Sequence, residues 1–371
     1  MDSKSTDLLV KFLIIATALV LLLAIVCTTL LVIAKNRSEP SGNDDTSDDV
    51  QGAFAPSSSE NSDTQNKVSG APLYPTKPSR TNYMSKSAAD VAQVGSAIKS
   101  NNAILVELGT YTSVAEKNAD EKIFPASMTK VMTLLVACER VTDLDKKLVV
   151  TQAHIDYKSK TGGSGDIPFA VGEGVRVRDL LQIIIHDSDT IACLLIAEYI
   201  AGSEAEYAAL MNKKAEDIGL KNTHFSSVTG LHDNENYTTC RDMAAIMAYA
   251  LENELVKEIM TYYKGYKFSA YIGDSNTVKY EYPTSWSDWY STRLSDNAYV
   301  KNSGGKTVAE IMAGKTGWEE IPRACFVTYA IDNNGKGYIC VVVGRSATSQ
   351  PNVLSTDSTA DTRYLYRNYV S

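Results

Sequence analysis

Cysteine and histidine are scarce in this chain of 371 residues, which contains six cysteines and four histidines. The cysteines show no paired spacing, which argues against a disulfide scaffold and favours small core side chains, without deciding whether any two of them pair. The histidines, at positions 154, 186, 224 and 232, lack the spacing of a zinc site. We therefore expect no metal and no cofactor.

An excess of basic residues is also missing, because 36 Lys and Arg stand against 44 Asp and Glu, for a net charge of −8. Proteins that bind nucleic acid need a basic face, so a nucleic-acid partner is not expected. No internal repeat is visible in the chain.

Charged residues are absent from residues 12–34, FLIIATALVLLLAIVCTTLLVIA. A helix of this length spans a hydrocarbon core of about 30 Å. The run is too long for the apolar core of a cleaved signal peptide, and it continues directly into Lys35 and Arg37. We expect an uncleaved transmembrane anchor at 12–34, after a short cytoplasmic N-terminus at 1–11.

Residues 35–86 lack periodic hydrophobic residues and are rich in Ser, Asn, Asp, Thr, Pro and Gly. Such a composition cannot bury enough apolar surface to become ordered, so it predicts a disordered linker. Residues 87–371 have a globular composition and the size of one domain.

Within 87–371 the hydrophobic pattern predicts an α+β fold, with helices against one antiparallel sheet. Strands are expected at 103–108, 147–150, 311–315, 324–332 and 338–343, and helices at 126–140, 178–186, 190–200, 203–219 and 239–251.

The helix expected after Pro125 is apolar on nearly every face, which is typical of a buried helix. Ser127 and Lys130 lie in its first turn, three residues apart on one face. Burial lowers the pKa of a lysine and leaves a neutral amine able to take the serine's proton. The unpaired N–H groups of the turn suit a developing oxyanion. The alternative is a capping serine beside a lysine whose charge reaches solvent.

Two further stretches could complete such a site. In Gly314-Lys315-Thr316-Gly317, a cation, a hydroxyl and a glycine border a strand, which suits a substrate carboxylate lying along a sheet edge; the alternative is an ordinary turn. Residues 186–190, HDSDT, lie between two apolar helices, where polar side chains are costly unless paired. Ser188 there could relay a proton near the Ser127 hydroxyl.

The order Ser-x-x-Lys, Ser-x-Asn, Lys-Thr-Gly is the signature of penicillin-binding proteins and class A β-lactamases. The segments FPASMTKVMTLLVACE, GLKNTHFSSVTGLHD and YTTCRDMAAIMAYAL resemble the serine-type D-Ala-D-Ala carboxypeptidases, which are low-molecular-weight penicillin-binding proteins. The resemblance covers about residues 103–345. It implies a β-lactamase/transpeptidase-like fold, in which a five-stranded antiparallel sheet and a helical subdomain flank the active site.

The resemblance also implies the roles of individual residues. Ser127 resembles the acylating nucleophile, Lys130 its general base, and Ser188 the serine that passes a proton to the leaving D-alanine. Lys315 and Thr316, followed by Gly317, match the segment that holds the terminal carboxylate. The backbone N–H groups of Ser127 and Trp318 would form the oxyanion hole.

One position departs from the family pattern, because the asparagine of Ser-x-Asn falls on Thr190. Threonine offers one hydroxyl on a shorter side chain, where asparagine offers an acceptor and two donors. Thr190 could therefore still bond to Lys130, directly or through a water molecule, but it is expected to hold the substrate amide less well. The alternative is a pocket rebuilt around threonine, in which Asp187 or Asp189 holds Lys130.

The first functional hypothesis is a membrane-anchored carboxypeptidase that removes the terminal D-alanine from peptidoglycan pentapeptides through an acyl-enzyme on Ser127 and binds β-lactam antibiotics. Its domain would lie outside the bacterial cell membrane, held by one span. The second is a catalytically weak, penicillin-binding wall-sensing or scaffolding protein, suggested by Thr190. The third, a β-lactamase, is disfavoured because the chain contains no Leu-Asn dipeptide for the deacylating Glu-x-x-Leu-Asn motif. Whether the aromatic-rich insert at 262–299 lines a glycan groove or covers the sheet edge stays open.

Overall fold

The computed structural model describes residues 71–262, 267–273, 278–282, 298–345 and 351–370. The N-terminal segment at 1–11, the anchor predicted at 12–34, residues 35–70 of the predicted linker and most of the insert at 262–299 lie outside the described residues. Within the described ranges, no helix is both long enough and apolar enough to cross a membrane.

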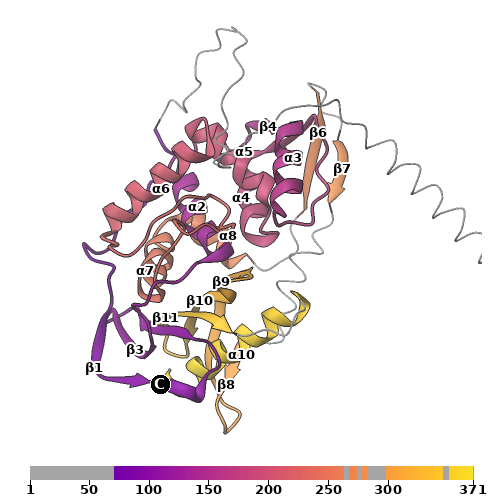
Figure 1. Cartoon of the computed structure of the whole chain (residues 1–371). Helices are drawn as coiled ribbons and strands as arrows, with labels where there is room; N and C mark the ends of the chain where they lie inside the picture. The colour runs from indigo at the N-terminus through magenta and orange to yellow at the C-terminus, as the bar shows by residue number, and fades with distance from the viewer. Residues whose placement is uncertain (1–70, 263–266, 274–277, 283–297, 346–350, 371) are drawn as a thin grey trace, which may run out of the picture. The chain divides into compact units, whose positions relative to one another are not determined.

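A seven-stranded sheet, with strand order β1-β3-β2-β11-β10-β9-β8, forms the centre of the described part (Figure 1). Its strands are β1 (Lys86–Gln93), β2 (Asn102–Glu107), β3 (Thr112–Lys117), β8 (Tyr299–Lys301), β9 (Thr307–Glu319), β10 (Arg323–Asp332) and β11 (Gly337–Arg345). The β1–β3 pair is parallel, and the other pairs are antiparallel. The expected α+β class is confirmed. The expectation of one five-stranded, purely antiparallel sheet is wrong, because this sheet has seven strands, β1 runs parallel to β3, and a second sheet is present.

Helices are the other main elements of the described chain. They are α2 (Thr129–Cys138), α3 (Gln152–Thr161), α4 (Val177–His186), α5 (Thr190–Ala201), α6 (Glu204–Ile218), α7 (Cys240–Ala250), α8 (Glu254–Thr261) and α10 (Pro351–Tyr369), with short 3-10 turns η1 (Gly95–Ala97) and η2 (Ala126–Met128). A second sheet of four strands, in the order β4-β5-β6-β7, joins β4 (Lys147–Val149), β5 (Glu173–Arg176), β6 (Phe268–Ile272) and β7 (Val278–Tyr282).

The central sheet is buried on both faces. Successive side chains of a strand point to opposite faces of the sheet. In β11, Ile339 and Val341 belong to the core that the sheet shares with α2, α4, α5 and α7. Cys340 and Val342 belong to the core on the other face, which includes Tyr366 of α10. The phenol of Tyr366 lies 2.9 Å from Thr328 Oγ1 on β10. The sheet is therefore the middle layer of three, which explains why β10 and β11 are almost continuously apolar.

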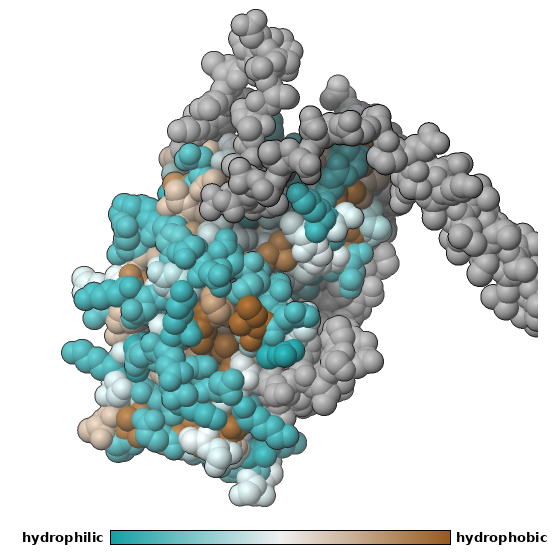
Figure 2. Space-filling view, in the orientation of Figure 1, coloured by the Kyte–Doolittle hydropathy of each residue, from teal (hydrophilic) through white to brown (hydrophobic). Residues whose placement is uncertain are grey.

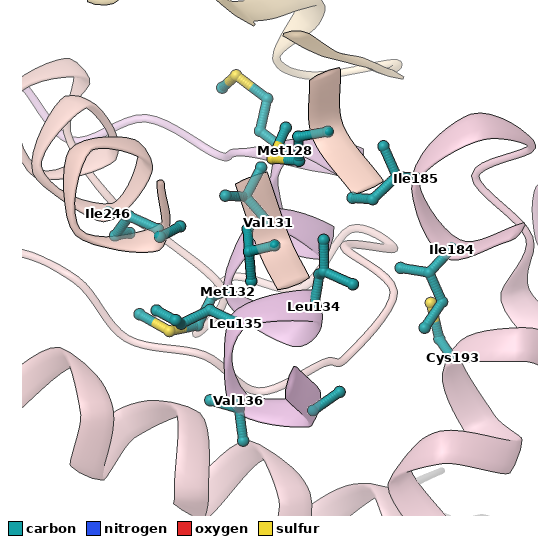
Figure 3. Packing of buried hydrophobic residues seen from close by; sticks show 14 of the residues in the cluster. Met128, Val131, Met132, Leu134, Leu135, Val136, Ile184, Ile185, Cys193 and Ile246 are labelled. Carbon is teal, nitrogen blue, oxygen red and sulfur yellow. The ribbon is translucent and has the colours of Figure 1, made fainter. Parts of the chain in front are cut away.

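Helix α2 lies in the main core, as its apolar sequence predicted. Each of its residues is buried. Figure 3 shows its side chains among Ile184 and Ile185 of α4, Cys193 of α5 and Ile246 of α7. Because helices surround α2, its N-terminal end and the turn before it are held in place by packing on several sides.

The folded part begins earlier than residue 87, where the sequence analysis placed its start. The Ser79 hydroxyl donates to Glu252 at 2.5 Å, the Tyr74 carbonyl accepts from Asn253, and Tyr83 is 3 % exposed. The linker predicted to run to residue 86 is therefore wrong over its last residues. The hydrophobic residues there are isolated in sequence, but they pack against a core formed by other segments.

The surface of the described part is mostly hydrophilic on the face seen in Figure 2, with hydrophobic areas confined to small groups. The described cysteines, Cys138, Cys193, Cys240, Cys325 and Cys340, are buried and free, in agreement with their interpretation as small core side chains.

Candidate active site

Ser127 lies in the 3-10 turn η2, immediately before helix α2. The sequence pattern predicted Ser127 in the first turn of the α-helix, and that detail is wrong. Ala126 has a φ of 47°, a conformation that interrupts regular α-helical geometry, so the chain forms a tighter turn there. The expected neighbour is nevertheless in place, because Lys130 Nζ lies 3.0 Å from Ser127 Oγ.

The Lys130 side chain is buried, with 1 % of the residue exposed. Its ammonium donates to the Thr229 carbonyl at 2.6 Å, to Ser127 Oγ at 3.0 Å and to Ser164 Oγ at 3.3 Å. Burial lowers the pKa of Lys130, and nearby acidic groups such as Asp189 offset this only in part. Lys130 thus has the contact and the environment of a general base for the Ser127 hydroxyl.

Ser188 lies in the short connection between α4 and α5, and its φ of 57° is uncommon for a residue with a side chain. Its hydroxyl accepts a hydrogen bond from Lys315 Nζ at 3.0 Å. Lys315 also donates to the Thr316 carbonyl at 2.8 Å. Burial, followed by the charge of Lys130, lowers the pKa of Lys315 to about 7. The structure therefore brings together the three sequence motifs, with a serine hydroxyl beside each buried lysine.

Strand β9 carries Lys315, Thr316 and Gly317 past the turn η2, which contains Ser127. A Cβ atom added to Gly317 would lie 3.0 Å from the Ser127 backbone nitrogen, closer than a side chain normally comes to its neighbours. Gly317 thus lets β9 approach this turn. Over residues 316–318, β10 is the partner of β9 among the described strands, while β8 pairs only with the first part of β9. This leaves an edge where an extended peptide could add as a strand. Trp318, the expected second oxyanion donor, follows on this edge with 42 % of the residue exposed.

Thr190 is in the expected place in the chain, but its hydroxyl does not hydrogen-bond to Lys130. It is fully buried at the start of α5, and its hydroxyl has no hydrogen-bond partner among the residues that the structure describes. A direct hydrogen bond from Thr190 to Lys130 is therefore absent from the described site. Neither aspartate accepts a hydrogen bond from Lys130 there: the Asp187 carboxylate accepts from the Asp166 backbone N–H, and the Asp189 carboxylate accepts from Lys158 Nζ.

Two groups that contact Lys130 were missed in the sequence. Ser164 belongs to the segment TGGSG at 161–165, in which no candidate functional residue was identified from the sequence. Its glycines were the available signal, since they permit close approach between backbone segments. Thr229 acts through its carbonyl oxygen, a group that every residue has, so no side-chain pattern could reveal it.

Comparison with known proteins agrees with this geometry. The model of the D-alanyl-D-alanine carboxypeptidase family, peptidase S11, matches residues 86–347. The carboxypeptidase DacF of Bacillus subtilis is 32% identical over 259 residues, which are 70% of this chain and 60% of DacF. DacC of Escherichia coli is 35% identical over 160 residues, which are 42% of this chain and 40% of DacC. The chain thus spans about half the length of these curated relatives.

Solved structures of similar fold include the Streptomyces K15 DD-transpeptidase, with a TM-score of 0.59, 24% sequence identity and coverage of 72% of this chain and 97% of that one. Penicillin-binding protein 5 from Haemophilus influenzae has a TM-score of 0.57 at 23% identity, covering 72% of this chain and 70% of its own. These likenesses show the fold. Together with the family match over most of the folded part, they establish that the chain belongs to the D-alanyl-D-alanine carboxypeptidase family.

Proposed function

We propose that this protein is a serine-type D-Ala-D-Ala carboxypeptidase that removes the terminal D-alanine from peptidoglycan pentapeptides and is acylated by β-lactam antibiotics. The observation that carries the proposal is the 3.0 Å contact between Ser127 Oγ and the amine of Lys130, whose pKa burial lowers. A hydroxyl beside such an amine is an activated nucleophile, as acyl transfer requires.

In the acylation step, Ser127 Oγ attacks the carbonyl carbon of the bond between the two D-alanines, and its proton passes to Lys130. The backbone N–H groups of Ser127 and Trp318 stabilise the charge that develops on the carbonyl oxygen. The proton then passes through the Ser188 hydroxyl to the amine of the departing D-alanine. Water hydrolyses the ester on Ser127 and returns the free enzyme.

The terminal carboxylate of the substrate is held by Lys315, Thr316 and Gly317 on the edge of β9. A cation is needed there, and the Lys315 ammonium already reaches the Ser188 hydroxyl at 3.0 Å. This contact links carboxylate binding to proton transfer, because the Ser188 hydroxyl that passes the proton also accepts a hydrogen bond from the Lys315 ammonium that binds the carboxylate. A β-lactam, which also carries a carboxylate beside its reactive amide, would use the same contacts.

We further propose that residues 12–34 anchor the protein in the bacterial cell membrane, with the folded part outside, because its substrate lies there. Residues 1–11 would remain in the cytoplasm. Protease added to intact protoplasts should release the folded part by cutting within residues 35–70. Complete protection of the chain would contradict this orientation.

The proposed activity is tested by two assays on the same full-length protein. The protein is labelled with a fluorescent penicillin, and D-alanine release is then measured from a pentapeptide ending in D-Ala-D-Ala. We expect both labelling and release. Labelling without release would favour the wall-sensing or scaffolding alternative, rapid hydrolysis of the penicillin would favour a β-lactamase, and failure of both assays would refute the proposal.

A further inference from the structure

Besides its hydrogen bonds to Ser127 and to the Thr229 carbonyl, Lys130 contacts Ser164, which lies outside the three family motifs. Ser164 Oγ lies 3.3 Å from its Nζ atom and comes from the loop between α3 and β5. We propose that Ser164 is a positioning residue, which directs the Lys130 amine towards Ser127 and supplies the contact that Thr190 does not make. This inference rests on the proposed function, since it assigns how its general base is oriented.

The hydrogen bonds around Ser164 fix which group donates. Its hydroxyl has one proton, which is directed to the Ser188 carbonyl at 2.5 Å, so towards Lys130 it can only accept. The Thr229 carbonyl can also only accept. Two N–H groups of Lys130 are thereby committed to Ser164 and Thr229. In the neutral amine, which has two N–H groups, the lone pair is then left for the Ser127 hydroxyl.

Residues 187–190, where the chain departs from the family pattern at Thr190, hold the loop that carries Ser164. The Thr190 backbone N–H donates to the Ser164 carbonyl at 3.0 Å. The Asp187 carboxylate accepts from the backbone N–H of Asp166 at 2.9 Å and from that of Ile167 at 3.3 Å. These bonds join the loop, at Ser164 and at residues 166–167, to the connection between α4 and α5 and the start of α5, and so place Ser164 next to Lys130.

The side chain of Asp189 secures the start of the same loop. It is fully buried, accepts from Lys158 of α3 at 2.7 Å and caps α5 by accepting from the Ala192 N–H at 2.8 Å. A Cβ atom on Gly165, which has a φ of 104°, would lie 2.1 Å from the Asp189 carboxylate. Only glycine allows the loop to pass this close.

Thr190 and the loop also fit each other sterically. A Cβ atom on Gly163 would lie 2.6 Å from Thr190 Oγ1, so the loop backbone fills the space next to this side chain. An asparagine at 190 would need room that the loop occupies. The compact threonine and the inserted Ser164 therefore belong to one arrangement, in which a loop hydroxyl takes the place of an amide on α5.

The test compares Ser164→Ala and Ser164→Thr with the unchanged full-length protein, measuring the rate of acylation by a fluorescent penicillin from pH 5.5 to 9.5. Thr161→Ala is the matched control, because its hydroxyl lies on the same segment but donates to the Tyr157 carbonyl. Melting temperatures establish that each variant is folded.

We expect Ser164→Ala to slow acylation by about 10- to 100-fold, the usual effect of losing one hydrogen bond to a charged group. In the pH profile of the acylation rate of Ser164→Ala, the acidic limb should move to lower pH. The reason is that protonated Lys130 loses a hydrogen-bond acceptor, which lowers the pKa of Lys130 further. Ser164→Thr keeps the hydroxyl and should stay within about threefold of the unchanged protein, as should Thr161→Ala.

Equal rates and equal pH profiles for the unchanged protein and Ser164→Ala would overturn the inference. Equal impairment of the folded Ala and Thr variants would overturn it as well, since the loop shape and not the hydroxyl would then matter. Failure of the proposed function is distinguishable from both results, because in that case the unchanged protein would not be acylated at all.

Discussion

The electrostatics of Lys315 predict how activity depends on pH. Burial and the charge of Lys130 lower its pKa from 10.5 to about 7, which corresponds to about 5 kcal/mol against the ammonium form. The substrate carboxylate needs that ammonium. In the free enzyme, Lys315 therefore loses its charge as the pH rises through about 7, so kcat/KM for D-alanine release should fall there.

The kcat of the same reaction should retain its value to higher pH, because a bound carboxylate favours the ammonium form of Lys315. Lys130 has the opposite requirement, because a general base must be neutral, so the rate rises as Lys130 loses its proton. Burial lowers the pKa of Lys130. The kcat/KM profile should thus be bell-shaped, with its descending limb near pH 7. The charge of Lys130 lowers the pKa of Lys315, so the titrations of the two amines are coupled and the limbs belong to the pair.

Initial rates of D-alanine release from a pentapeptide, measured from pH 5 to 10, give this profile. Lys315→Arg is the informative variant, because a guanidinium stays protonated over this range and should abolish the descending limb even if its maximum rate is lower. A peptide with an amidated C-terminus is the control substrate, and its slower cleavage should lack the limb. A descending limb that persists unchanged in Lys315→Arg would refute the assignment of Lys315.

Three further changes test other parts of the structure. Gly163→Ala places a Cβ atom 2.6 Å from Thr190 Oγ1 and should displace the loop, slowing penicillin acylation by at least about tenfold; an unchanged rate would contradict the packing described here. The pKa of Asp187 is raised to about 7, chiefly by burial, so unfolding releases its proton between about pH 4 and 7 and stability falls as the pH rises through that window. Asp187→Asn keeps an acceptor oxygen and should flatten this pH dependence in urea unfolding, raising the free energy of unfolding by up to about 4 kcal/mol at pH 8. An equally steep pH dependence in Asp187→Asn would show that Asp187 does not cause it. Leu135→Ala, at a fully buried position of α2, should lower the free energy of unfolding by about 2–5 kcal/mol, and a loss below about 1 kcal/mol would mean that this core is less tightly packed.

Much of the site could be predicted from the sequence, because the side chains that meet there belong to the motifs themselves. Ser127, Lys130, Ser188 and Lys315 were expected to meet, and the structure joins them in two hydrogen-bonded pairs. The position of Thr190 could be predicted, but its surroundings could not. Its neighbour Ser164 comes from a loop without periodicity, and the hydrogen bonds that place that loop are mostly made by backbone groups.

The fold was predictable where burial leaves a pattern. Strands β10 and β11 carry long apolar runs and were expected close to their observed bounds. Strand β1, KSAADVAQ, is polar and largely exposed, so no pattern marked it. Helix α10 is polar over much of its length, and in its part from residue 358 onwards Leu365 and Tyr366 reach the core. Such edge and outer-layer elements are fixed by tertiary contacts more than by their own sequence.

The central claim is that an acyl-enzyme forms on Ser127, and peptide mapping by mass spectrometry tests it most directly. The full-length protein is incubated with benzylpenicillin, quenched, digested and compared with Ser127→Ala treated in the same way. We predict one penicilloyl adduct, located on Ser127, and none in the folded Ser127→Ala protein. An adduct on another residue, or one that persists in Ser127→Ala, would contradict the account.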